Sequence, residues 1–446
     1  MHHSSSSTLS RRFVLQIGMI FCATLFFFVD HSSAETPKAF VLQEQGDLKW
    51  YRGNLHTHSH WSDGDDYLGN IALWYRDNGY HFLSFTDHNV LAQGVRWVDV
   101  EKTKGGQTAF DKLLKNFPDQ IETREEEGVL QVRLRTFGEV ERRFNKPGEF
   151  LLIQGEEISD KYDRYPIHMN ASNVGELITP RGGASVAETI QNNVNAVMTQ
   201  RERTGQSTLI HLNHPNFGFA VTAEDLMRVV GEKFFEVYNG HPSVYNAGND
   251  THSSTERMWD IILTRRIDEF ELPLMYGIAV DDGHNYHRIP SRQAEPGRGW
   301  VVVLADELSA ETLVQALEAG KFYASSGVAL KRIAVDGKQM NVEVEPVEGE
   351  TYTIEFIGTR QGYDPRSEPV VDENGEPVRA TRRYSDDIGQ ILQSSEGTSA
   401  AYTFQGDEIY VRARITSSAV HPNPSEVGDK KQAWIQPVVV NGSDSE

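Results

Sequence analysis

Short apolar runs that end in polar residues alternate with stretches of helical periodicity between residues 48 and 284. Seven runs are predicted strands, at residues 49–54, 81–86, 150–154, 167–171, 208–212, 234–238 and 274–280. The predicted helices lie at residues 68–78, 109–117, 184–203, 223–230 and 255–266. Strands that alternate with helices are typical of parallel sheets. The pattern therefore predicts an α/β fold, built as a parallel barrel or an open sheet.

The pattern changes after residue 327. Alternating apolar and polar positions then recur, at residues 333–335, 342–344, 352–356 and 409–415. Turn signals between them, such as Asp336-Gly337, favour antiparallel β-structure. Because 446 residues exceed one average domain, we expect one domain over residues 35–327 and a small β-sandwich over residues 328–440. Residues 441–446 are a predicted tail.

Residues 93–149 interrupt the alternation and are predicted to be an irregular insertion in the first domain. A charge run at residues 122–127 indicates a solvated helix or loop. The alternating stretch at residues 129–134 is compatible with an inserted strand near the mouth of the site. In the C-terminal part, the polar residues 394–399 are expected to form a loop.

The first 34 residues have the features of a secretory signal. Arg11 and Arg12 precede an apolar run at residues 13–29, and small residues lead to Ala34, after which we expect cleavage. The protein is thus predicted to be exported to the periplasm or secreted, without stable membrane insertion. An uncleaved anchor is the alternative, because the run is nearly long enough to span a bilayer. Cys22, the only cysteine, lies in this leader, so the mature chain forms no disulfides.

Composition and charge limit the kinds of molecule that the protein is expected to bind. The chain is 38% hydrophobic and 24% charged, as in a soluble globular protein, and its formal net charge is −21. Such a surface repels nucleic-acid backbones and anionic lipid, since binding to them usually requires a basic stripe. We therefore expect no nucleic-acid partner, and a nuclease is disfavoured.

Side chains that can bind metals recur where the predicted strands end. In chain order they are His56, His58, Asp87, His88, Glu156, Glu157, His168, His211, His214, Glu236, Asp281, Asp282 and His284. The carboxyl ends of parallel strands open onto one face, so these residues should converge. Imidazole and carboxylate ligands suit Zn, Mn or Fe. They are too many for one ion, so a bridging carboxylate is expected from the Glu156-Glu157 pair, of which only one member should face the ions.

Five motifs carry a resemblance to a known family. They are His56-Thr57-His58 with Ser62-Asp63-Gly64, Thr86-Asp87-His88-Asn89, Gly155-Glu156-Glu157-Ile158-Ser159, His214-Pro215 and Asp282-Gly283-His284. Residues 50–330 resemble the PHP (polymerase and histidinol phosphatase) superfamily. This resemblance implies a distorted seven-stranded (β/α)7 PHP barrel with two or three divalent metal ions at its mouth. Residues 313–327, 410–414 and 432–437 look like the CehA/McbA-type branch, whose best-known members hydrolyse carbaryl-like carbamate esters.

The resemblance also implies a division of the ligands among three ions. His56, His58, Glu157 and Asp282 would bind the first ion, Glu157 with His168 and His214 the second, and Asp63, His88 and His284 the third. Glu157 is preferred to Glu156 because the family's glutamate lies two residues after the glycine, and Asp282 to Asp281 by its spacing to His284. His60 and His211 are additional histidines that would bind substrate or hold the ligands in place. Asp87 is expected to orient a ligand.

These residues predict a hydrolase that acts on a small-molecule ester. Bound ions lower the pKa of water, so that a hydroxide bridging two of them can attack the ester near neutral pH. Glu157 and Asp282 would support this step, with His284, His60 or His211 as the acid for the leaving group. A phosphoester is the predicted substrate. The alternatives are a carboxyl or carbamate ester, and a non-catalytic metal- or glycan-binding protein. The sequence identifies no partner for the β-sandwich.

Overall fold

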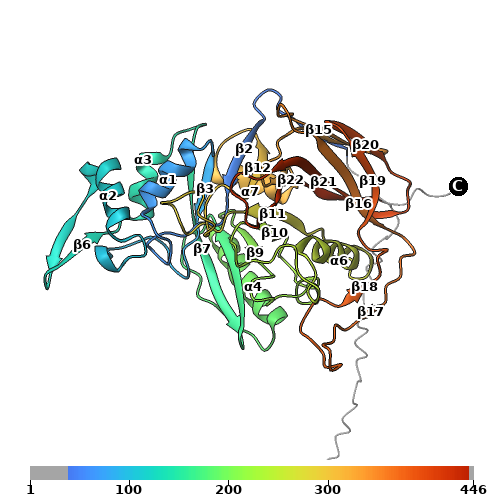
Figure 1. Ribbon diagram of the computed structural model, residues 1–446, viewed down its shortest axis with the longest axis horizontal. Helices are drawn as coiled ribbons and strands as arrows, with labels where there is room; N and C mark the ends of the chain where they lie inside the picture. The colour runs from blue at the N-terminus through green and yellow to red at the C-terminus, as the bar shows by residue number, and fades with distance from the viewer. Residues whose placement is uncertain (1–38, 441–446) are drawn as a thin grey trace, which may run out of the picture. The chain divides into compact units, whose positions relative to one another are not determined.

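The computed structural model describes residues 39–440, which form a mixed α/β structure around a thirteen-stranded sheet (Figure 1). The strand order in this sheet is β11-β10-β9-β8-β7-β3-β2-β12-β13-β22-β21-β16-β19. The N-terminal half comprises β2 (Lys49–Asn54), β3 (Phe82–Phe85), β7 (Leu151–Tyr162), β8 (Tyr165–Ser172), β9 (Leu209–Leu212), β10 (Phe234–Asn239) and β11 (Tyr276–Val280). All seven predicted strands are therefore present, and the predicted α/β class is confirmed.

One of the seven strands runs in the opposite direction to the prediction. β2, β3 and β7 are mutually parallel, and so are β9, β10 and β11, but β8 is antiparallel to both β7 and β9. Only Asp163 and Arg164 separate the paired residues Tyr162 and Tyr165. A two-residue connection can join only antiparallel strands, because a parallel pair needs a crossover of about a dozen residues. The expectation of a wholly parallel sheet was therefore wrong at β8.

Backbone pairing between the segments that follow β2 and β11 consists of a single bridge in the described residues. An isolated parallel bridge joins Thr57 to Gly283, and the amide of His58 donates to the carbonyl of Gly283 over 3.0 Å. Beyond β2, the sheet continues into β12 (Trp300–Ala305) and β13 (Phe322–Ser325). The closed seven-stranded barrel implied by the resemblance stays a prediction, whereas the large mixed sheet is established.

Helices pack on this half of the sheet through apolar faces. In α6 (Thr255–Asp268), Met258, Ile261 and Ile262 are buried in one cluster with side chains of β10, as their helical spacing predicted. Outside the insertion, the other α-helices are α1 (Leu68–Asp77), α4 (Val186–Thr204), α5 (Ala223–Leu226) and α7 (Ala310–Glu318). α4 begins at its cap Ser185, whose side chain accepts from Glu188 N, and ends at Gly205 in the left-handed conformation.

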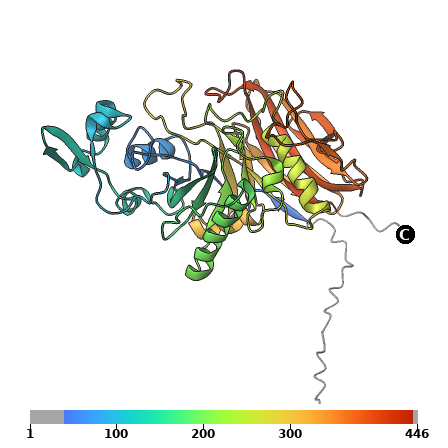
Figure 2. The same ribbon diagram turned by 90° about the horizontal axis from the view of Figure 1, so that it is seen from below.

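The insertion at residues 93–149 has its own small sheet. Its elements are β4 (Trp97–Asp99), α2 (Gly106–Asn116), β5 (Thr123–Glu126), β6 (Val129–Arg133) and α3 (Phe137–Phe144). The charge run forms the exposed strand β5, so its prediction as helix or loop was wrong. Glu127 and Gly128 both have positive φ, at 54° and 79°, and such a two-residue turn favours a hairpin. Figures 1 and 2 both place this insertion and the C-terminal strands on opposite sides of the central strands.

The C-terminal part contains two sheets that share one apolar core, and β17 and β18 form a separate two-stranded sheet. The strands are β14 (Leu330–Val335), β15 (Gln339–Val344), β16 (Tyr352–Arg360), β17 (Ser367–Glu368), β18 (Arg383–Tyr384), β19 (Gln390–Glu396), β20 (Ser399–Thr403), β21 (Glu408–Val420) and β22 (Lys430–Val439). A four-stranded sheet, β1-β14-β15-β20, includes β1 (Phe40–Leu42). Its buried side chains pack with those of β16, β21 and β22. The loop predicted at residues 394–399 is mostly strand, with Gly397 and Thr398 between β19 and β20.

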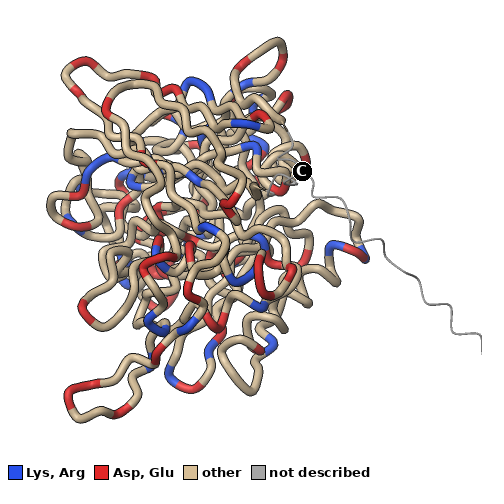
Figure 3. The backbone as a smooth tube through the Cα atoms, turned by 90° about the vertical axis from the view of Figure 1, so that its right-hand side faces the viewer, with Lys and Arg blue, Asp and Glu red and all other residues tan. Residues whose placement is uncertain are grey.

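The two predicted domains are continuous in the structure. β13 pairs with β22, and the described residues 39–440 belong to one compact unit. The predicted leader (1–34) and tail (441–446) lie outside the described residues. Between residues 39 and 440, no helix is long and apolar enough to cross a membrane. Acidic and basic positions are interspersed along the backbone on the side shown in Figure 3.

Candidate metal centre

Apart from Asp63, the predicted ligands lie in two strands of the central sheet or directly after four others. His56 and His58 follow β2, His88 follows β3, Glu157 and His168 lie in β7 and β8, His214 follows β9, and Asp282 and His284 follow β11. Within the described residues, ligand atoms of these side chains, with Asp63, His211 and Glu236, form five groups in which all atoms lie within 4.8 Å of one another. The convergence of strand ends inferred from the sequence is therefore observed.

The buried carboxylate of Glu157 is the centre of this cluster. Its oxygens face ring nitrogens of His88 at 2.7 Å, His168 at 2.9 Å, His58 at 3.4 Å, His214 at 3.5 Å and His56 at 3.6 Å. Oε1 faces His56, His168 and His214, whereas Oε2 faces His58 and His88. Asn213 donates to Oε1 over 2.8 Å. One carboxylate thus presents its two oxygens to two sets of imidazoles, as a bridging ligand would.

His56, His58 and Asp282 form a compact donor set beside Glu157. The Nε2 atoms of the two histidines are 3.1 Å apart, and each is 3.3 Å from Oδ1 of Asp282. Asp282 has a φ of 51° and accepts from Asn239 Nδ2 at its other oxygen. Two converging imidazole nitrogens and a carboxylate are the donor set that Zn, Mn and Fe prefer. The residues present therefore fit a divalent cation.

A second carboxylate, Asp63, faces three imidazoles on the outer side of the cluster. Its Oδ1 lies 3.3 Å from Nε2 of His284, 3.5 Å from Nε2 of His88 and 3.7 Å from Nδ1 of His58. This oxygen is buried and has no hydrogen-bond partner among the described residues. Buried acceptors normally have a partner, so a bound cation would complete this site.

The predicted division among three ions is only partly reproduced by distance. Asp63, His88 and His284 do lie together, but His58 joins them. His168 groups with Glu157 and His88, whereas His214 groups with His56 and Asp282. The assignment of both His168 and His214 to one ion with Glu157 stays a prediction.

The charges of the cluster are strongly coupled. Burial opposes ionisation of Glu157, but His168, His88 and His56 outweigh it and hold its pKa well below the usual range. Burial, with His284 nearby, lowers the pKa of His58 to about 3. Burial also disfavours protonated His88, yet Glu157 outweighs it and raises the pKa of His88 to about 9. A metal ligand must be a neutral imidazole, so cation binding would release protons from His88.

Glu236 has a structural role at the site that the sequence did not reveal. It is fully buried in β10 and accepts from His56 Nδ1 at 2.7 Å, His214 N at 2.7 Å and Asn239 Nδ2 at 2.8 Å. Burial opposes its ionisation, but His56 and His211 lower its pKa to about 2. The contact to Nδ1 fixes the ring of His56 so that Nε2 faces the cluster, an arrangement typical of metal-binding histidines. In the sequence, the position of Glu236 in the sixth predicted strand was the only indication of this role.

The two additional histidines, His60 and His211, have different surroundings in the structure. His211 is fully buried and contacts Glu236 at 3.2 Å, behind His56. His60 belongs to none of the five groups. Its Nδ1 pairs with the carbonyl of Gly64 at 3.0 Å, its ring packs against Tyr67, and burial lowers its pKa to about 4. These positions favour support of neighbouring segments over contact with a reacting ester.

Asp87 and Asp281 hold the loops that present the cluster. Asp87 accepts from Ser59 and Ser62 at 2.6–2.8 Å and so fixes the loop between His58 and Asp63, whereas a direct bond to a ligand stays a prediction. In this loop a Cβ at Gly64 would meet the carbonyl oxygen of His58 at 2.4 Å, so only glycine fits. Asp281 accepts from Tyr75 and from the amides of residues 298 and 299, away from the ligands.

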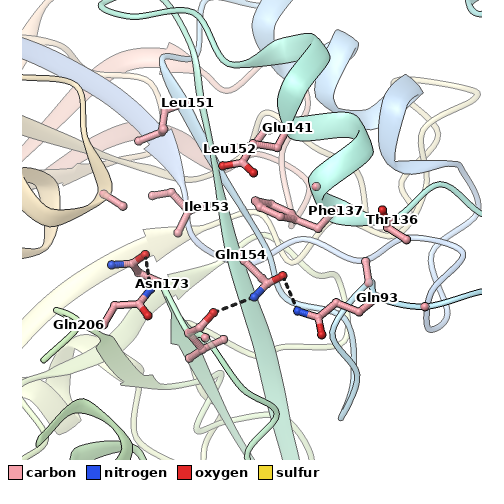
Figure 4. A pocket seen from close by; sticks show the side chains of 16 residues that line it. Gln93, Thr136, Phe137, Glu141, Leu151, Leu152, Ile153, Gln154, Asn173 and Gln206 are labelled. Atoms are coloured by element: carbon pink, nitrogen blue, oxygen red, sulfur yellow. Dashed lines mark hydrogen bonds between the residues drawn. The ribbon is translucent and has the colours of Figure 1, made fainter. Parts of the chain in front are cut away.

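A separate pocket of about 540 Å³ lies away from these residues (Figure 4). Apolar side chains such as Ile153 and Phe137 line it together with amides. Gln93 donates to Gln154, and Gln206 donates to Asn173, so these amides bond to one another. None of the predicted site residues borders this pocket.

Comparison with known proteins yields only distant structural similarities. No family model and no curated protein matches the chain. A protein from Bacteroides vulgatus, described as a two-domain protein containing a predicted PHP-like metal-dependent phosphoesterase, is similar over 89% of this chain and 97% of its own, with 13% identity and a TM-score of 0.39. A Bifidobacterium adolescentis protein described as a proposed metal-dependent phosphoesterase is similar over 53% of this chain and 89% of its own, with 13% identity and a TM-score of 0.29. An amidohydrolase from Chromobacterium violaceum is similar over 52% and 87%, with 12% identity and a TM-score of 0.26. Similarities this distant do not transfer an activity to this chain.

Replacing Asp63 by alanine is expected to remove one ion and leave the others bound. Among the predicted ligands, Asp63 contacts only the imidazoles of His58, His88 and His284. The substitution leaves His56, Glu157 and Asp282 in place. Elemental analysis of wild type and variant, purified side by side without chelator, measures the difference. Loss of every ion, or of none, would contradict a separate outer site.

Proposed function

We propose that this chain is an exported metal-dependent hydrolase of the PHP type that cleaves a small-molecule phosphoester. The observation that supports it best is the single buried carboxylate, Glu157, facing five imidazole nitrogens, some of which also face Asp282 or Asp63. A structural role alone does not require so many ionisable side chains at one sheet edge, since burying each of them has an energetic cost. We also propose that the chain belongs to the CehA/McbA-type branch of this superfamily.

Two or three divalent ions, when bound, would supply an acidic water and a Lewis acid for the ester oxygen. His56, His58, Glu157, Asp282, His168 and His214 would hold two of them, and Asp63, His88 and His284 the third. The protein's own part in the reaction is to fix these side chains: Glu236 orients His56, and Asp87 orders the loop before Asp63. With only two ions bound, His284 would not be a ligand, and its side chain, which is 14% exposed, is then the candidate to protonate the leaving group.

Turnover of three nitrophenyl esters tests this function. Protein purified without chelator is analysed for metals, then loaded with Mn, Zn or Fe and assayed with nitrophenyl phosphate, bis-nitrophenyl phosphate and nitrophenyl acetate. We expect metal-dependent release of nitrophenol from the phosphates, abolished by chelator and restored by metal. Preference for the acetate would instead favour a carboxyl or carbamate esterase. Silence with all three esters at full metal loading would favour a metal- or glycan-binding protein.

A further inference from the structure

The insertion at residues 93–149 brings one basic side chain to the edge of the metal centre. Nζ of Lys104 lies 3.1 Å from Oδ2 of Asp63, while Oδ1 of the same carboxylate faces His58, His88 and His284. Among the ion pairs of residues 39–440, this is the only one between a lysine or arginine and a predicted ligand. A cation from the insertion thus touches a carboxylate that also faces the site.

An open pocket of about 430 Å³ lies beside this contact. His60, Ser62 and Asp63 border it on one side, and the segments 96–99 and 102–104 of the insertion on the other. Of five pockets compared between residues 39 and 440, it is the one whose wall contains a predicted metal ligand, Asp63. A substrate group that reaches the outer set of imidazoles therefore has room to extend toward the insertion.

The other basic groups around this pocket already have partners. The guanidinium of Arg96 donates to the carbonyl of Trp61 and lies over the indole ring. The ammonium of Lys102 pairs with Asp99. Lys104 has Asp63 as its one partner among the described residues, and the two side chains are 56% and 41% exposed. An ion pair so exposed contributes little, so the ammonium can exchange or share its carboxylate contact with another anion.

We propose that Lys104 binds the anionic group of the substrate and so selects phosphomonoesters over neutral esters. This inference rests on the proposed function and concerns the same site. The ammonium is a compact point charge with three donors, one of which already meets Asp63. A phosphoryl oxygen placed between the outer imidazoles and the pocket would accept a hydrogen bond from another N–H of this ammonium. A neutral carboxyl ester has no charge for this group to bind, whereas a phosphomonoester dianion must be held among the carboxylates of Asp63, Glu157 and Asp282.

Three esters with one leaving group and decreasing charge test the assignment. Nitrophenyl phosphate is a dianion at pH 8, bis-nitrophenyl phosphate a monoanion and nitrophenyl acetate neutral. For Lys104→Ala we expect kcat/KM to fall about tenfold to a hundredfold with the dianion, which is the usual value of a hydrogen bond to a charged group. The fall should be smaller with the monoanion and absent with acetate. Inhibition by inorganic phosphate should weaken in parallel, and Lys104→Arg should restore part of both effects.

Lys102→Ala is the matched control, because Lys102 lies two residues away on the same exposed segment and pairs with Asp99 instead. It should leave all three rates and the phosphate inhibition unchanged, and metal content should equal wild type in every variant. An equal fall with all three esters in Lys104→Ala, or no fall with the dianion, would overturn the role of Lys104 while leaving the hydrolase intact. If wild type hydrolyses none of the esters, the proposed function itself fails.

Discussion

Glu157→Gln is expected to lower kcat/KM by about a thousandfold or more and to reduce metal content by two ions. Both carboxylate oxygens of Glu157 face imidazoles, Oε1 three of them and Oε2 two. An amide of the same shape supplies one neutral oxygen and one N–H group, and the N–H group points at ring nitrogens or at a cation. Loss of several kcal/mol of electrostatic stabilisation corresponds to about a thousandfold in rate. Elemental analysis and the ester assays measure the two effects.

The neighbouring residue provides a matched control for this change. Glu156 precedes Glu157 in β7, and its carboxylate points to the other side of the strand and accepts from the amide of Ile178 at 2.6 Å. Burial raises the pKa of Glu156 to about 8, so it is mostly neutral at pH 7 and glutamine resembles it closely. Glu156→Gln should therefore keep its ions and its activity. Full metal content and full turnover in Glu157→Gln would show that the bridging assignment is wrong.

The position of the cluster could be predicted because it depends on periodicity. Residues that follow successive strands lie at one edge of a sheet regardless of how far apart they are in the sequence. His56, His88, Glu157 and Asp282 were placed together on this basis alone. The antiparallel direction of β8 does not disturb the result, since His168 faces Glu157 from within its strand at 2.9 Å. The sequence predicts no helix between β7 and β8, and this absence was the signal that the two strands form an antiparallel hairpin.

Which ligands share an ion could not be read from the sequence. It depends on the direction of each side chain, and therefore on contacts such as Glu236 with His56. The same holds for His60, which lies between predicted ligands in the sequence but turns toward the carbonyl of Gly64. Local spacing places a residue on a segment, whereas the hydrogen bonds of the folded chain determine where its ring points.

The insertion and the C-terminal strands show a second limit of sequence patterns. β5 is exposed along its whole length, so it has no apolar alternation to mark it as a strand, and its pairing with β6 is set by the turn at Glu127 and Gly128. β1 pairs with β14 across nearly three hundred residues. Such long-range pairing follows from the packing of both sheets on one core, which local sequence does not encode.

Asp260→Asn is expected to lower the free energy of unfolding by about 3–5 kcal/mol, the usual cost of leaving a buried charge without its partner. Asp260 in α6 accepts from Nε and Nη2 of Arg412 in β21, each over 2.7 Å, and from Tyr410 over 2.7 Å. Both members of the ion pair are buried. Asparagine fits the same space but leaves the buried guanidinium without its two short bonds to a carboxylate, so that Glu256, 3.4 Å from Nη1, is its remaining countercharge. Urea unfolding followed by fluorescence and circular dichroism measures the change.

Two further variants separate the buried charge from other effects. Glu176→Ala removes the exposed partner of Arg203 and should change stability by less than about 1 kcal/mol. The double variant Asp260→Leu with Arg412→Met removes both charges and should recover most of the loss, because apolar side chains can replace a buried ion pair. Asp260 touches none of the predicted ligands, so folded Asp260→Asn should retain its metal and its turnover per folded molecule. α6 follows β10, the strand that carries Glu236, so a change in α6 can reach the metal centre. If Asp260→Asn lost its metal but kept its free energy of unfolding, the contact between α6 and β21 would act on the metal centre and not on the stability of the fold.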